Sequence, residues 1–197
     1  MPIIEPLGEI IAASTCEITG QCRREGPPFV FGSIVASGRS LHRCVGVVYN
    51  VETTSIDPNR RSIALDKTEE EIERFYPQLK ALLRIQFQAL LIGSLENGAF
   101  RYGLPAAPPA LHAQAAPCSE DELDAISNQP DFIRLLFDSG KSSAEELILS
   151  CCRHLLDALQ WRDELVVRTG KALSDLYRDD YETLRRLINR LESWRTQ

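Results

Sequence analysis

The chain has 197 residues, of which 44% are apolar and 25% charged, as expected for a globular protein with one large domain or two small ones. Its net charge of −6 repels phosphate backbones and argues against broad electrostatic binding of nucleic acid. No apolar run reaches the roughly 18 residues of a membrane span, and the N-terminus lacks a secretory signal. We therefore expect a soluble, cytoplasmic protein whose six cysteines stay reduced.

The first third of the chain predicts short strands. Stretches rich in β-branched and small residues at 7–18, 29–35 and 41–54 are separated by glycine and proline, a pattern typical of a barrel or sandwich. Gly32 and Gly46 lie inside two of these stretches, where glycine often marks a bend or a bulge. We predict a small β-barrel.

Residues 68–83 change to helical spacing. Thr68 and Glu71 fit a capping box, in which each side chain satisfies the other's backbone donor. Pro77 is expected to kink or divide the helix at Tyr76. The apolar stripe of this inserted helix consists of Ile72, Phe75, Leu79 and Leu82.

Strand character returns at 85–93. Asn97-Gly98 predicts a tight hairpin, because both residues accept positive φ, with a return strand at 99–102. Residues 105–117 contain four prolines. We expect them to run extended along the surface, as an edge strand or a strap.

From Ser119 onward the pattern is helical, and Ser119 with Glu122 forms a second capping box. We expect four helices. The first ends near residue 128 and the second runs from Pro130 to Gly140. The third runs from Ser142 or Ser143 to about residue 159, and the last from 162 to 194. The predicted fold class is therefore α+β. An N-terminal β-barrel with an inserted helix, at 1–126, is followed by a helical hairpin or bundle at 127–197.

The last expected helix would span roughly 50 Å, more than the width of a small barrel, so part of it must pair with the preceding helix or with another chain. Its apolar stripe has heptad spacing and is a candidate interaction surface. The end of the helix is locally basic, which suits either the helix dipole or a nucleic-acid or partner contact. The stripe is Tyr177, Tyr181, Leu184, Ile188 and Leu191; the basic end carries Arg185, Arg186, Arg190 and Arg195 with Trp194.

Ser139-Gly140-Lys141-Ser142 resembles the end of a phosphate-binding loop. That loop needs a glycine five residues before Gly140, where this chain has Leu135. We therefore interpret Gly140 as the end of a helix and the following serine as the cap of the next one.

The sequence contains no catalytic or metal-binding motif that we recognise. His42, His112 and His154 fall in three different elements, and Cys151 with His154 supplies at most half of a zinc site. No nucleophile elbow, zinc-protease motif or dinucleotide fingerprint is present. We expect no enzymatic activity, no cofactor and no metal, and we expect the vicinal Cys151 and Cys152 to be buried.

The first 126 residues resemble the HAS barrel, the small N-terminal β-barrel of HerA-type translocases and rotary ATP synthase subunits. In that family the barrel joins neighbouring subunits into a ring, and in HerA-type proteins it can dock a nuclease. The resemblance is closest to stand-alone bacterial HAS-barrel proteins, since a helical segment stands where the motor domain would follow. The matching segments are Gly8-Glu9-Ile10-Ile11, Ser14-Thr15, Phe31-Gly32-Ser33-Ile34-Val35, Val45-Gly46-Val47-Val48, Leu91-Ile92-Gly93, Leu104-Pro105, Pro108-Pro109 and Ser119.

Three functions remain open. The first is a non-enzymatic protein-interaction or assembly module, homo-oligomeric, whose barrel edges, proline strap and helical tail contact other proteins; an ATPase or a nuclease is the partner that the resemblance implies. The second is an accessory subunit of a DNA-processing ATPase or nuclease system that contacts DNA through the C-terminal helix. The third is a hydrolase that uses carboxylate or cysteine chemistry.

Overall fold

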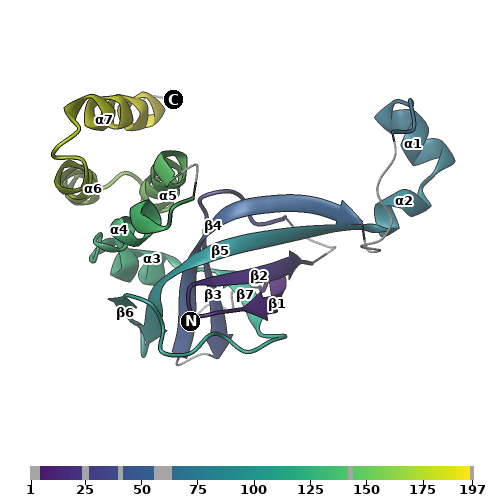
Figure 1. Cartoon of the computed structure of the whole chain (residues 1–197), viewed down its shortest axis with the longest axis horizontal. Helices are drawn as coiled ribbons and strands as arrows, with labels where there is room; N and C mark the ends of the chain where they lie inside the picture. Colours follow the sequence, from purple (N-terminus) through teal and green to yellow (C-terminus); the bar gives the residue numbers. More distant parts are fainter. Residues whose placement is uncertain (1–4, 24–26, 40–41, 56–63, 142–143, 196–197) are drawn as a thin grey trace.

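The computed structural model describes residues 5–23, 27–39, 42–55, 64–141 and 144–195. A closed six-stranded β-barrel is followed by a helical region (Figure 1), which confirms the α+β prediction. The strands are β1 (Gly8–Ala13), β2 (Glu17–Cys22), β3 (Ile34–Arg39), β4 (His42–Ser55), β5 (Leu83–Glu96), β6 (Ala99–Tyr102) and β7 (Gln114–Pro117). The helices are α1 (Glu69–Phe75), α2 (Gln78–Ala81), α3 (Glu120–Ser127), α4 (Phe132–Asp138), α5 (Ala144–Ala158), α6 (Asp163–Leu176) and α7 (Tyr181–Arg195).

The barrel is antiparallel throughout. Its strands follow the order β2-β1-β7-β3-β4-β5, and pairing of β2 with β5 closes the circle, while β6 extends the sheet beyond β5. Ile10, Ile18 and Phe87 are fully buried in the interior. The ring of Phe29 lies 4.6 Å from that of Phe87 and fills the interior from the loop between β2 and β3.

β4 is buried on both faces where it crosses the barrel, which accounts for the continuous apolar run Cys44–Val48. Val48 belongs to the barrel interior, whereas Val47 packs outward into a second core that contains Ile148 of α5. A strand covered on both faces needs no alternation of polar and apolar residues. The helices α3–α7 lie together on this side of the barrel (Figure 1).

Gly32 lies close to the backbone of α5. It adopts φ +82°, and a Cβ there would lie 2.5 Å from the Cβ of Ser150 on α5. The Ser150 hydroxyl donates to the carbonyl of Phe31 at 2.9 Å, and Nε2 of His154 lies 3.1 Å from the same oxygen. Glycine is required here both for its backbone conformation and for its lack of a side chain.

Two of the predicted strands have different boundaries. The stretch 7–18 divides into β1 and β2, because the Ser14 hydroxyl accepts hydrogen bonds from the amides of Cys16 and Glu17 and stabilises a turn. The stretch 29–35 becomes a strand only at Ile34, because Phe29 fills the barrel interior and Gly32 adopts a positive φ, so the chain turns before the strand begins.

Several local predictions are confirmed. The capping boxes of Thr68 and Ser119 both form. Pro77 separates α1 from α2 at Tyr76, and the hairpin residues Asn97 and Gly98 have φ values of 52° and 84°.

The proline-rich segment 105–117 is not an edge strand. Its end forms β7, which pairs with β1 on one side and with β3 on the other. Residues 113–116 contain no proline, so their amides can donate on both sides of the strand. The edge-strand alternative is wrong because three of the four prolines, at 105, 108 and 109, precede the strand and Pro117 is its last residue; the strap alternative stays a prediction for the residues before β7.

The last predicted helix is two helices. α6 ends at Leu176 and α7 begins at Tyr181. Asp180 accepts a hydrogen bond from the amide of Thr183 at 3.0 Å, as an N-cap aspartate does, and this contact lowers the pKa of its carboxyl. The continuous 50 Å helix is therefore absent, and α7 folds back against α5 and α6.

The domain division at residue 126 stays a prediction. It falls inside α3, and one apolar core continues across it from Ile34 to Leu191. The predicted serine cap at 142–143 lies outside the described residues. None of the helices in the described ranges is both long and apolar enough to cross a membrane.

Candidate interaction surfaces

The predicted stripe of the C-terminal helix mostly faces the core. Tyr177 is buried, and its ring lies 5.5 Å from that of Phe137. Burial raises the pKa of its hydroxyl to about 12. Tyr181 is exposed on the first turn of α7, so the structure does not bring these two tyrosines onto one surface. Leu184, Ile188, Leu191 and Trp194 pack against the core together with Leu187, which sequence reasoning missed.

Most of the arginines at the C-terminal end have acidic partners on other helices. Arg186 lies 2.7 Å from Glu145, and Arg190 holds Glu146 with two hydrogen bonds, the second at 2.8 Å. Arg190 lowers the pKa of the Glu146 carboxyl. Arg195 pairs with Asp163 at 3.0 Å.

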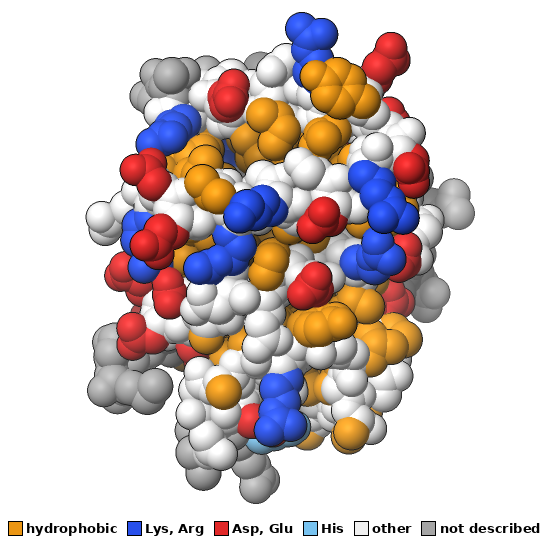
Figure 2. Space-filling model, turned by 90° about the vertical axis from the view of Figure 1, so that its left-hand side faces the viewer, with side chains coloured by type: hydrophobic (Ala, Val, Ile, Leu, Met, Phe, Trp, Pro, Cys, Tyr) orange, Lys and Arg blue, Asp and Glu red, His pale blue; other side chains and the backbone are white. Residues whose placement is uncertain are grey.

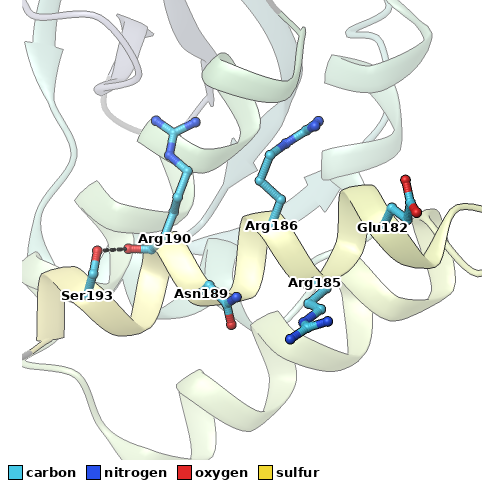
Figure 3. Close-up of a pocket in the computed structure, with 6 residues that line it drawn as sticks. All are labelled: Glu182, Arg185, Arg186, Asn189, Arg190 and Ser193. Atoms are coloured by element: carbon cyan, nitrogen blue, oxygen red, sulfur yellow. Dashed lines mark hydrogen bonds between the residues drawn. The ribbon is translucent and has the colours of Figure 1, made fainter.

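Arg185, Arg186 and Arg190 line an open hollow of about 520 Å³ on α7. In Figure 3, Arg186 and Arg190 extend from one side of the helix, and Arg185 and Asn189 from the other. Because two of the three cations are paired, the hollow offers little net positive charge for a nucleic acid. Figure 2 shows acidic and basic side chains intermixed over this side of the molecule.

A polar cluster joins the barrel to the loop before α5. Glu17 of β2 accepts hydrogen bonds from Tyr49 of β4 and from Lys141, both at 3.1 Å. The Lys141 ammonium also lies 4.1 Å from the centre of the Tyr49 ring. The hydrogen bond from Lys141 lowers the pKa of the Glu17 carboxyl. The pKa of Lys141 is raised, mainly by its contact with Tyr49. Lys141, the lysine of the segment that resembles the end of a phosphate-binding loop, thus attaches the helical region to β2.

This cluster predicts a difference in acid stability. Because the folded-state pKa of Glu17 lies below its ordinary value of 4.5, its ionised form stabilises the fold fully above that value, and the contribution disappears as pH falls through the folded-state pKa. The Glu17→Gln variant should therefore unfold at lower urea concentration than the parent at neutral pH and at the same concentration in strong acid. Equal midpoints at neutral pH would contradict this role.

The cysteines and histidines form no recognisable reaction centre. Burial raises the pKa of Cys118 and Cys152 to about 12 and that of Cys151 well above its ordinary value, so these thiols are poor nucleophiles. His112 lies beside Glu9 on the barrel surface. His154 contacts the backbone of Phe31. The described residues include no cluster of three or more His, Cys, Asp or Glu placed to hold a metal ion.

Within the closed circle of six strands, the described residues leave none of the open edges that the sequence predicted, and unpaired sides remain where β4 and β6 extend beyond the circle. β6 has an outer side, but Gln129 occupies it. The side-chain amide of Gln129 donates to the carbonyl of Phe100 at 2.7 Å and accepts from the amide of Tyr102 at 3.4 Å. Gln129 thus pairs with β6 as a neighbouring strand would.

Exposed apolar side chains are frequent on an arm, which we define as residues 51–55 and 64–86. Beyond Gln86, where the pairing of β5 with β2 ends, β4 and β5 continue as a two-stranded ribbon, and α1 and α2 lie at its far end, away from the helical region (Figure 1). Among the described residues thirteen large apolar side chains are exposed, and five of them belong to the arm. These five are Leu65, Phe75, Tyr76, Leu82 and Leu83.

Comparison with models of known protein families and with curated proteins finds no match to this chain.

Proposed function

We propose that this chain is a non-enzymatic protein-interaction or assembly module and that the arm is its docking element. The observation that carries the proposal is the concentration of exposed apolar side chains on the arm. Clusters of this kind, away from the main core, are characteristic of surfaces that another protein covers. The likeness to the HAS barrel, which docks subunits and nucleases, agrees with this role and makes an ATPase or nuclease the first partner to test.

The arm is suited to docking because it has both apolar side chains and a defined polar border. Phe75 is 57% exposed at the end of α1 and Leu83 is 42% exposed at the start of β5. The guanidinium of Arg74 lies 5.5 Å from the centre of the Phe75 ring, and α1 begins with three glutamates. Aromatic and aliphatic anchors with a charged rim are the usual composition of a binding surface.

The arm variant Phe75→Ser/Leu83→Ser tests the proposal. Proteins that the parent chain retains from a native extract are cross-linked, identified and prepared in pure form, and their Kd values are then measured. Two buried anchors each contribute more than about 1 kcal/mol, so the arm variant should bind at least about tenfold more weakly. Its stability should change by no more than about 0.5 kcal/mol, because both side chains are exposed in the free chain.

A matched control uses two leucines of similar exposure outside the arm. Leu104 and Leu111 are 54% and 59% exposed, and the variant Leu104→Ser/Leu111→Ser should bind as the parent does. Equal affinity of the arm variant and the parent for every purified partner would refute the arm as the docking element.

A further inference from the structure

The outer end of β4 has an unpaired side. β4 pairs with β5 along its whole length, as far as Ser55 opposite Leu83, but its pairing with β3 ends at Val47. The loop before β3 adds two more hydrogen bonds, in which the amide of Gly32 donates to the carbonyl of Val48 at 2.7 Å and the amide of Val48 donates to the carbonyl of Ser33 at 2.9 Å. No described strand pairs with residues 50–54 on this side. Such an edge presents backbone donors and acceptors to any further strand.

The sequence of this edge favours strand pairing. Val51, Thr53 and Thr54 are β-branched, which suits the extended conformation, and the segment has no proline and one charge, Glu52. Edges left unpaired in monomeric proteins are usually protected by proline, lysine or a covering side chain, as Gln129 covers β6 in this chain.

We propose that a second copy of this chain pairs with the edge, antiparallel and about a two-fold axis centred on Thr53. This register places Thr53 opposite Thr53 of the second copy, a favourable cross-strand pair, and places Glu52 opposite Thr54. A centre on Glu52 would instead oppose two glutamates, which is destabilising. The edge is thus self-complementary, as a two-fold interface requires, and the product is a four-stranded sheet of β5, β4 and their two symmetry mates.

This pairing also places the arm against the second copy. The proposal therefore rests on the function proposed above, and it identifies the protein that the arm docks to as a second copy of this chain. In an antiparallel pair the two arms point in opposite directions, each along the other copy. Five residues of strand, about 17 Å, separate Thr53 from Val48, where the barrel mouth and the exposed Val30 lie. The arm of each copy therefore runs toward the end of the second copy where Pro27, Pro28 and Val30 are exposed.

Light scattering of the full chain tests the proposal. The parent should have twice the monomer mass of 22.1 kDa. Thr53→Glu places glutamates opposite one another and should weaken the dimer at least about tenfold, and Thr53→Lys should do the same through opposed lysines. An equimolar mixture of the two variants should regain the dimer mass, because each glutamate then meets a lysine. Thr15→Glu, an equally exposed threonine in the turn between β1 and β2, should remain dimeric.

A parent chain that is monomeric at high concentration would overturn the proposal, as would a Thr53→Glu variant as dimeric as Thr15→Glu. Recovery in the mixture also shows that both variants fold, since unfolded chains would not pair. The proposed function can survive this failure: a monomeric chain that binds a different protein, and loses it in the Phe75→Ser/Leu83→Ser variant, keeps the docking arm and excludes the self-paired edge.

Discussion

Replacing Gly32 with alanine is expected to lower the free energy of unfolding by about 3 kcal/mol. The new Cβ would lie 2.5 Å from the Cβ and 2.8 Å from the carbonyl carbon of Ser150, so α5 must move away from the barrel, and overpacking of this kind costs about 1–3 kcal/mol. The positive φ of Gly32 adds a further backbone penalty for alanine. Urea denaturation monitored by far-UV circular dichroism measures the loss.

Gly140→Ala is the matched control. Gly140 also has a positive φ, +68°, but a Cβ there meets no atom within 4 Å, so this variant isolates the backbone penalty of about 1 kcal/mol. Both tryptophans, Trp161 and Trp194, lie in the helical region, so fluorescence reports on that region alone. The fluorescence and dichroism transitions should coincide, as a comparison of free energies of unfolding requires. Equal losses in the two variants would show that the contact with Ser150 does not matter.

The features predicted correctly from the sequence are those that depend on neighbouring residues. A capping box such as Thr68 with Glu71 involves side chains three positions apart, and the hairpin at Asn97 and Gly98 depends on the φ preferences of two residues. Pro77 acts on its own turn of helix. Each of these signals is complete within a few residues, so no knowledge of the tertiary structure is needed.

The errors concern contacts between distant segments. Nothing near Gln114 indicates that β7 lies between β1 and β3. In the chain, β1 lies about 100 residues before β7 and β3 lies about 80 residues before it. In the sequence, Arg186 and Arg190 indicate a basic patch. In the structure they pair with Glu145 and Glu146, which belong to another helix. A pattern of charge in one helix does not reveal the charges that face it.

The candidate site illustrates the same division. The inserted helix and its apolar stripe were predicted, but a stripe at helical spacing usually faces a core. Phe75 and Leu82 are instead exposed, because β4 and β5 extend beyond the barrel and hold α1 and α2 away from the helical region. The open edge at Thr53 was also beyond prediction, since it depends on where β3 ends.

The second large effect is expected at Glu122, which carries two structural contacts. One carboxylate oxygen pairs with Arg43 of β4, and the other accepts the amide of Ser119 at 2.8 Å. The side chains of Arg43 and Glu122 are only 17% and 12% exposed. Glu122→Gln preserves the shape but leaves the Arg43 guanidinium without its counter-charge in a poorly hydrated site, and loss of one partner of a buried pair costs about 3–5 kcal/mol. We expect a loss of about 3 kcal/mol in urea denaturation.

Two further variants test whether the unpaired charge of Arg43 causes the loss of stability in Glu122→Gln. Glu145→Gln removes the partner of Arg186 in an exposed pair and should cost less than about 1 kcal/mol. The double variant Arg43→Met/Glu122→Leu removes both charges and should recover most of the stability lost in Glu122→Gln, because apolar side chains of similar size tolerate burial. If the double variant is as unstable as Glu122→Gln, the cap of α3 at Ser119, rather than the ion pair, accounts for the importance of Glu122.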